Sequence, residues 1–148
     1  MAKTISQFQP GEKFITKSKI VTTTDIDTFA RITGYDNRMF LDEEYAKSKG
    51  WKTRIVQGGL TFSMSIGLLE NSGLIDNIIA YLGTDKLKFT APVYPHDILT
   101  VDGELLDKRI SKDGGRGIIH YKWTTKNQKG EAVVEGENTC MFEVHKPR

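Results

Sequence analysis

The sequence has few of the residues that build disulfide frameworks, metal centres or membrane spans. Its 148 residues include one cysteine, Cys140, and three histidines, His96, His120 and His145. A single cysteine excludes an internal disulfide and any multi-cysteine zinc site, and we expect no metal. No apolar stretch approaches the roughly 20 residues that span a bilayer, and the polar N-terminal segment lacks the apolar core of a signal peptide. The sequence therefore predicts a cytoplasmic protein.

Charge of one sign is also scarce. The chain carries 21 Lys and Arg against 19 Asp and Glu, a formal net charge of +2, and no block of like charge. Such a chain lacks the electrostatic footprint of a protein that binds nucleic acid or a membrane surface. Its length and its 38% hydrophobic residues are typical of one ordinary domain, which we expect to comprise residues 1–148.

Hydrophobic periodicity divides the chain into a helical first half and a strand-rich second half. Hydroxyl and carboxylate caps at residues 22–25 predict a helix that Gly34 ends, and a short amphipathic helix follows Asp42 and ends near Gly50. Residues 35–40, between these two helices, are expected to be irregular. Residues 58–69 then form a helix that is apolar nearly all round, so other structure has to enclose it.

Alternating apolar and polar residues predict strands at 14–22, 86–91, 98–101, 117–126 and 132–144, separated by turn sequences. We expect one antiparallel sheet that wraps around the apolar helix, an α+β arrangement known as the hot-dog fold. Such a sheet leaves an open edge and exposed apolar surface. The fold therefore predicts at least a dimer, either a homodimer or a higher oligomer of dimers.

Three segments together resemble the MaoC-like hydratases and dehydratases, a family that includes the (R)-specific enoyl-CoA hydratases. They are FARITGYDNRMFLD at residues 29–42, IVQGGL at 55–60 and FTAPVYPHD at 89–97. The resemblance covers roughly residues 8–142. It implies the hot-dog fold and an acyl thioester as ligand, carried on coenzyme A or on acyl carrier protein. Coenzyme A would then be part of the substrate, and no further cofactor is implied.

The chain departs from the family pattern at the positions that perform the chemistry. The family motif reads Thr-Gly-Asp-x-Asn-Pro-x-His-x-Asp, and its Asp and His activate the water that adds to the conjugated thioester. In register, Tyr35 replaces this Asp and Phe40 replaces this His, whereas Asn37 is retained. Gln57 stands where the second motif usually has a His that precedes a Gly.

Two residues, Asp36 and Tyr35, remain candidates for a catalytic role. Asp36 is the nearest replacement carboxylate, although an Asp at this place can equally face solvent and cap the turn at Asn37. Tyr35 could donate a proton or a hydrogen bond, or its ring could simply fill the site.

The binding candidates are Gly58, Gly59, Gln57, Asn37 and Phe40. The Gly58 N–H begins the apolar helix and could meet a thioester carbonyl, unless the two glycines only permit a tight turn. Gln57 could orient a carbonyl or a water, and Asn37 is expected to hold its loop. Four cations, Arg38, Arg54, Lys86 and Lys88, could meet coenzyme A phosphates or be ordinary solvated charges.

Three functions fit these residues. The first is a hydro-lyase of the enoyl-CoA hydratase or 3-hydroxyacyl-CoA dehydratase type with a non-standard active site. The second is an inactive acyl-CoA-binding chain, or a partner subunit of a heteromer in which a sister chain supplies the Asp and the His. The third and weaker one is an acyl-CoA thioesterase that uses Asp36.

Overall fold

The computed structural model describes residues 7–72 and 77–144 of the chain, so His145 lies outside the described residues. The elements are, in order, β1 Lys13–Ile20, α1 Thr23–Thr33, α2 Arg38–Leu41, α3 Glu43–Ser48, α4 Gly58–Glu70, β2 Ile78–Phe89, β3 Ile98–Ile110, β4 Arg116–Lys126 and β5 Ala132–Glu143. None of the helices in these residues is long and apolar enough to cross a membrane.

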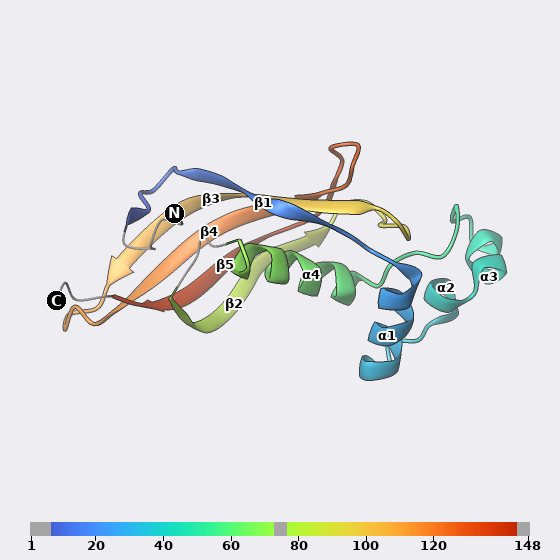
Figure 1. The fold of residues 1–148 in the computed structure, drawn as a ribbon, viewed down its shortest axis with the longest axis horizontal. Coiled ribbons are helices and arrows are strands. Elements are labelled where there is room, and N and C mark those ends of the chain that lie inside the picture. Colours follow the sequence, from blue (N-terminus) through green and yellow to red (C-terminus); the bar gives the residue numbers. More distant parts are fainter. Residues whose placement is uncertain (1–6, 73–76, 145–148) are drawn as a thin grey trace.

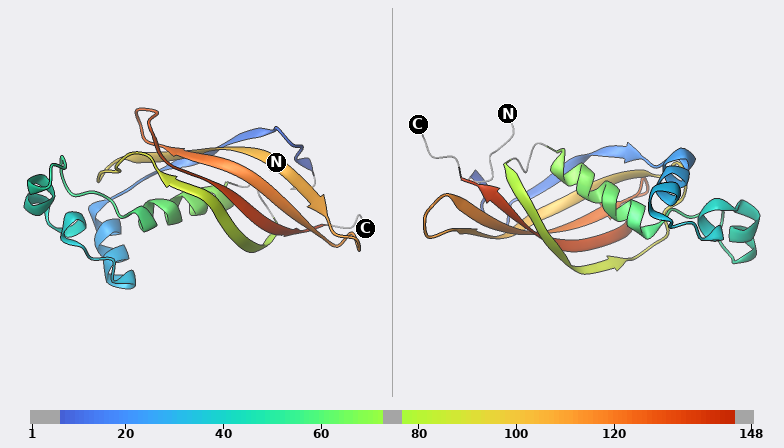
Figure 2. Two further views of the ribbon diagram at one scale, coloured as in Figure 1. Left: turned by 180° about the vertical axis from the view of Figure 1, so that it is seen from behind. Right: turned by 90° about the horizontal axis from the view of Figure 1, so that it is seen from below.

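The strands form one antiparallel sheet in the order β1-β3-β4-β5-β2, so β1 and β2 are its edges. The sheet curves, and α4 lies along its concave side (Figures 1 and 2). Helices α1, α2 and α3 gather at the end of the sheet where α4 begins (Figure 1). This is the hot-dog fold that the sequence predicts. The structure differs in the extent of two strands. β2 runs from Ile78 to Phe89 where a strand at 86–91 is expected, and β3 continues to Ile110 past an irregularity between Leu105 and Asp107.

Local capping explains where the first helices begin and end. Thr22 and Asp25 form a reciprocal capping box at the N-terminus of α1, and Gly34 ends this helix in the left-handed conformation, as predicted. The expectation of an irregular segment at 35–40 is wrong in part. Asn37 accepts a hydrogen bond from the Met39 N–H, and the short helix α2 follows it. Four residues are too few to show a helical period in the sequence.

Helix α4 is only partly enclosed by its own chain. Leu60, Thr61, Ser65 and Leu69 are buried against the sheet. The apolar side chains on its other faces, Phe62, Met64, Ile66 and Leu68, are only partly buried. Within one chain, other structure therefore encloses the helix on one side only, whereas the sequence predicts that the whole helix is enclosed.

Aromatic rings on the concave face lie over glycines of neighbouring strands. In the strand register Phe14 pairs with Gly103, Trp123 with Gly136, and Phe142 with Gly117. A Cβ atom at any of these glycines would come within 3.0 Å of the paired ring. Because glycine has no side chain, a large ring of the neighbouring strand can lie against its backbone. This close approach helps the sheet to curve around α4.

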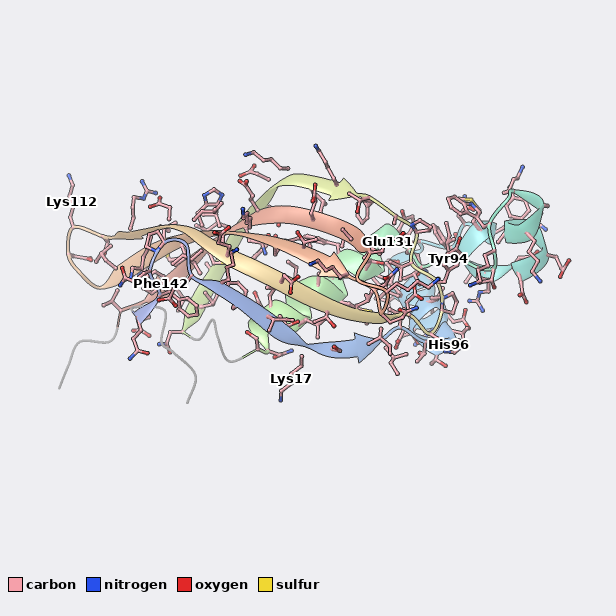
Figure 3. All side chains as sticks on the ribbon, turned by 90° about the horizontal axis from the view of Figure 1, so that it is seen from above. Lys17, Tyr94, His96, Lys112, Glu131 and Phe142 are labelled. Atoms are coloured by element: carbon pink, nitrogen blue, oxygen red, sulfur yellow. The ribbon has the colours of Figure 1, made fainter. Side chains whose placement is uncertain are left out.

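The turn before β3 contains a strained residue at the same end of the molecule as α1 to α3. His96 has a φ of 74°, and its N–H donates to the Val21 carbonyl at 2.6 Å. Figure 3 shows His96 with Tyr94 at this end of the sheet, far from Lys112. The next residue, Asp97, is buried and accepts hydrogen bonds from the Tyr94 N–H at 2.9 Å and from the Gln128 amide at 2.9 Å.

We expect His96→Gly to stabilise the protein. A residue with a Cβ pays about 1–2 kcal/mol in the left-handed region, whereas glycine costs about 0.5–1 kcal/mol of extra chain entropy. The net gain in unfolding free energy should reach about 1 kcal/mol, read from urea-unfolding midpoints. His96→Ala keeps the Cβ and should bring no gain; an equal gain in both variants would show that the imidazole, and not the backbone, is unfavourable.

Candidate acyl-binding site

A cavity of about 490 Å³ opens where α4 begins. Its walls come from the loop after α1, from α2, from the segment before α4 and from the segment that follows β2. The lining residues are Tyr35, Phe40, Trp51, Ile55, Val56, Gly58, Gly59, Thr61, Phe89, Thr90, Ala91, Pro92, Val93 and Val133. Segments far apart in the sequence thus enclose one largely apolar pocket.

Gly58 and Gly59 lie in this pocket, at the first turn of α4. A Cβ on Gly58 would come to 3.0 Å from the Phe89 ring, and one on Gly59 to 3.2 Å from the Phe29 ring. No side chain caps this helix, since Gln57 makes no cap hydrogen bond. The first N–H groups of a helix have no acceptor within it and carry the positive end of its dipole. The pocket therefore offers backbone donors to a carbonyl oxygen that enters it.

Tyr35 and Phe40 form one wall of the pocket, which we call the aromatic wall. Their ring centroids are 5.1 Å apart, and the Phe29 ring lies 6.4 Å from Tyr35 on its other side. Phe40 is 6% exposed and Tyr35 is 45% exposed. The two positions that carry the acid and base in the family motif are therefore neighbours in the pocket, as the resemblance implies, but here they hold rings.

Asp36 and Asn37 lie on the same loop but are exposed, and neither is among the lining residues in the described part of the chain. The Asn37 side chain accepts from the Met39 N–H at 3.0 Å, so it holds its loop. Asp42, also kept from the family motif, caps α3. The Tyr45 N–H and the Arg38 guanidinium beside it hold the pKa of this carboxyl below its usual range.

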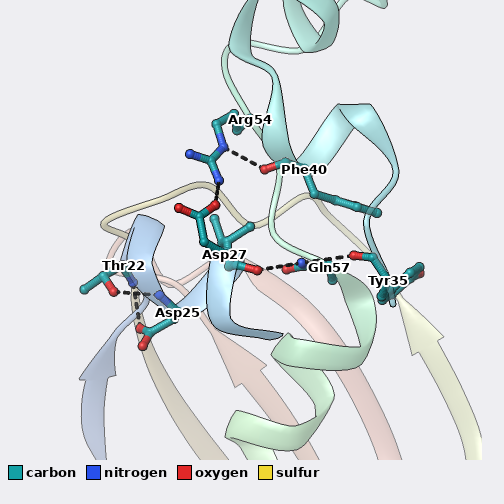
Figure 4. A network of polar contacts seen from close by, with 8 residues as sticks. Thr22, Asp25, Asp27, Tyr35, Phe40, Arg54 and Gln57 are labelled. Carbon is teal, nitrogen blue, oxygen red and sulfur yellow. Dashed lines mark hydrogen bonds and ion pairs between the residues drawn. The ribbon is translucent and has the colours of Figure 1, made fainter. Parts of the chain in front are cut away.

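Gln57 is fully buried but does not line the pocket. Its side-chain Nε2 donates to the Ile26 carbonyl at 3.0 Å and to the Tyr35 carbonyl at 3.4 Å, and Oε1 has no hydrogen-bond partner among the described residues. The Gln57 amide therefore donates to two backbone carbonyls of the protein, and not to a carbonyl or a water in the pocket as the sequence suggests. Helix α4 begins at the next residue, so Gln57 links α4 with α1 and the aromatic wall (Figure 4).

Three of the four cations proposed for phosphate binding have partners inside the chain. Arg54 pairs with Asp27 and donates from Nε to the Phe40 carbonyl at 2.6 Å. Arg38 pairs with Asp42 at 3.0 Å, and Lys86 pairs with Glu137 at 3.2 Å. Their first role is structural. Arg54 bonds the backbone of Phe40, whose ring lines the pocket (Figure 4).

Other candidate groups lie away from this pocket. Cys140 is buried in the sheet, and burial raises the pKa of its thiol to about 11, so the thiol is neutral at pH 7. His120 contacts Glu137, with Nε2 3.1 Å from the carboxylate. Neither residue is among those that line the pocket in the described ranges.

Sequence reasoning missed several lining residues. Trp51 follows α3 in a segment without periodicity, and no sequence signal marks it. Phe89 and Ala91 belong to the third motif, but their alternation only predicted a strand. Thr61 is buried and its hydroxyl donates to the Gln57 carbonyl one helical turn earlier, and no sequence signal marks it as a lining residue.

The comparisons with known proteins agree with this architecture. The family model described as "MaoC like domain" matches residues 6–127. The chain is 38% identical over 141 residues to the uncharacterized protein YdeM of Bacillus subtilis, covering 93% of this chain and 97% of YdeM. It is 29% identical over 128 residues to an (R)-specific enoyl-CoA hydratase of Rhodospirillum rubrum, covering 84% and 81%.

A solved structure, the monoamine oxidase regulatory protein of an Archaeoglobus species, superposes with a TM-score of 0.86 at 29% identity over 99% of both chains. The shared fold and the extent of the family match define the class of protein. The chain belongs to the MaoC-like domain family.

Proposed function

We propose that this chain binds an acyl thioester in the pocket at the start of α4 and does not hydrate it with its own side chains. One observation carries this proposal. Among the described residues that line the pocket there is no carboxylate, imidazole or amine, and the only titratable group is the Tyr35 phenol. Hydration needs a base for water and an acid for the α-carbon. The Tyr35 phenol alone does not supply both groups.

The pocket offers the groups that binding of an acyl thioester requires. The uncapped first turn of α4 can donate to the thioester carbonyl, and the apolar walls can hold the acyl group. Such a chain would act as an acyl-CoA-binding protein or as the partner of a catalytic sister chain. We keep the cytoplasm as its expected compartment.

A hydro-lyase is the second candidate, supported by family membership and by the similarity to an (R)-specific enoyl-CoA hydratase. It requires the Asp36 carboxylate to turn inward, next to Tyr35. A thioesterase would require the same movement of Asp36. The test is titration calorimetry of the protein with butyryl-CoA and free CoA, beside an assay for loss of the crotonyl-CoA double-bond absorbance. Binding without turnover supports the proposal; turnover that Asp36→Asn abolishes supports the hydro-lyase.

A bulky residue at position 58 should remove binding while the fold persists. The Gly58→Val side chain would lie against the Phe89 ring, which also lines the pocket, and would occupy the pocket beside the helix N-terminus. We expect roughly tenfold or greater loss of butyryl-CoA affinity. Gly67→Ala on the same helix has nothing within 4 Å of the new Cβ and should bind like the wild type. Unchanged affinity in Gly58→Val would place the ligand elsewhere.

We further propose that two copies of the chain pair through β2. Within residues 7–72 and 77–144 this edge strand is bonded only to β5, and it exposes Ile79 by 48%, Leu82 by 51% and Phe89 by 53%. A second copy would continue the sheet and cover the half-exposed side of α4.

Leu82→Lys is therefore expected to shift the protein from dimer to monomer in sedimentation velocity. A charge placed in a paired apolar edge loses its hydration without gaining a partner. Ile15→Lys changes a more exposed apolar residue, at 64%, on the opposite edge strand β1, and should leave the mass unchanged. A dimer that survives Leu82→Lys but not Ile15→Lys would move the interface to β1.

A further inference from the structure

Two side chains that do not line the pocket hold the backbone of its aromatic wall. Gln57 reaches the Tyr35 carbonyl, and Arg54 reaches the Phe40 carbonyl. Each also binds α1, Gln57 through the Ile26 carbonyl and Arg54 through the Asp27 carboxylate. Figure 4 shows both links between α1 and the loop that carries the wall. Both wall residues are thus tied to one rigid helix by donors from the segment that leads into α4.

Stability alone does not explain an amide at position 57. Gln57 is fully buried, and its Oε1 has no hydrogen-bond partner among the described residues. A buried unpaired acceptor costs about 1–3 kcal/mol, more than a net hydrogen bond contributes. An apolar side chain of the same length would avoid that cost. What only the amide supplies here is a pair of donor hydrogens, one to the Ile26 carbonyl at 3.0 Å and one to the Tyr35 carbonyl at 3.4 Å, which together tie the backbone of Tyr35 to α1.

Arg54 acts on the other ring in the same manner. Its side chain is 17% exposed, whereas its partner Asp27 is 59% exposed. An ion pair with one exposed member contributes little to stability. The Nε bond to the Phe40 carbonyl, at 2.6 Å, is charge-assisted and directional. This bond, rather than the ion pair, holds the Phe40 carbonyl in place and with it the backbone that follows Phe40.

We propose that Gln57 and Arg54 are positioning residues that set the separation between the aromatic wall and the start of α4, and thereby the size of the acyl group that the pocket accepts. This inference rests on the proposed function, because it concerns the ligand of the same pocket. Its physical basis is that closely packed walls discriminate between ligands that differ by a few methylenes. Neither residue is expected to contact the ligand, so neither should affect the affinity for free CoA.

The test measures acyl-length selectivity, as the ratio of dissociation constants for octanoyl-CoA and butyryl-CoA. The variants are Gln57→Met, which keeps the length and volume, and Arg54→Met, which removes both of the Arg54 contacts. We expect each to lower this ratio by roughly threefold or more, with the affinity for free CoA unchanged. Hydrogen exchange of the amides in residues 35–41, measured without ligand, should become faster in both.

Two control variants separate positioning from general loosening. Asp27→Asn removes the charge of the ion pair but leaves the bond from Arg54 to Phe40, and should keep the wild-type ratio. Lys47→Gln removes the exposed pair with Glu43 on α3 and should do the same. Urea unfolding of every variant identifies any that fails to fold, and Arg54→Met is the safer variant because its site is partly exposed.

The outcomes are distinct. A wild type that binds no acyl-CoA overturns the proposed function and, with it, the selectivity. A wild type that binds, with Gln57→Met and Arg54→Met keeping its ratio and its exchange rates, overturns this inference alone. Equal weakening of butyryl-CoA, octanoyl-CoA and free CoA would also overturn it, because that result indicates a general structural role.

Discussion

The double variant Tyr35→Asp/Phe40→His is expected to hydrate crotonyl-CoA, whereas the wild type is not. In the MaoC-like motif these two positions hold the acid and base that activate water, and both line the pocket here with Gly58. Their rings are 5.1 Å apart in the wild type, so an aspartate and a histidine at the same places would lie close enough to share a water. We expect the backbone N–H groups at the start of α4, which carry no side-chain cap, to donate to the developing enolate oxygen.

The size of the gain follows from what the two groups supply. General acid–base catalysis contributes about 10²–10⁴-fold, so the double variant should exceed the wild type by at least about a hundredfold. The measurement is the rate of loss of the conjugated-thioester absorbance, with butyryl-CoA binding measured in parallel. Each single variant lacks one group and should remain close to the wild-type rate.

Two controls locate the effect. Adding Gly58→Val to the double variant should abolish the gain, because it fills the pocket without touching the new acid or base. A double variant that binds butyryl-CoA but does not hydrate crotonyl-CoA would show that the aromatic wall does not place these positions as the family motif does. A wild type that already hydrates, with a rate that Asp36→Asn removes, would favour a hydro-lyase with a relocated carboxylate.

Sequence signals predict the structure correctly where a feature depends on residues that are close together in the chain. The capping box at Thr22 and Asp25, the end of α1 at Gly34 and the start of α4 at Gly58 depend on residues within a few positions of each other. The apolar pattern of α4 can also be read within one segment, and it predicted that other structure covers this helix, which the sheet does on one side. The helix α2 was missed because one turn shows no period, and the Asn37 cap alone does not reveal whether a turn or a helix follows.

The candidate site was predicted in part. The resemblance places four residues together, and the structure has all four in the lining of one pocket: Tyr35, Phe40, Gly58 and Gly59. The role of Gln57 could not be foreseen, because it depends on the carbonyls of Ile26 and Tyr35, which lie 31 and 22 residues away in the chain. A glutamine read alone offers both a donor and an acceptor, and only the tertiary structure decides which atoms meet them.

Gly117→Ala is expected to be among the most destabilising single-methyl changes in the sheet, with a loss of about 3 kcal/mol in unfolding free energy. The new Cβ would lie 2.2 Å from the Phe142 ring and 2.9 Å from the Arg109 carbonyl oxygen. Phe142 is 0% exposed, so its ring cannot move aside into solvent, and the carbonyl belongs to the paired strand β3. This overlap outweighs the gain of about 0.5–1 kcal/mol that replacing a strand glycine normally brings.

Gly83→Ala is the matched control for this prediction. It also replaces a glycine within a strand, but its Cβ would meet no described atom of the same chain within 4 Å. Both glycine changes are made in the Leu82→Lys background, in which the proposed pairing of β2 is removed, so only the entropic gain remains for Gly83→Ala. Urea unfolding at one fixed protein concentration compares the two variants, because pairing of subunits makes the midpoint concentration-dependent. Equal effects of the two changes would mean that the Phe142 ring does not lie over Gly117. The expected difference between them would show that the Phe142 ring lies over Gly117, so that the side chain absent from β4 makes room on the concave face for a large ring of β5.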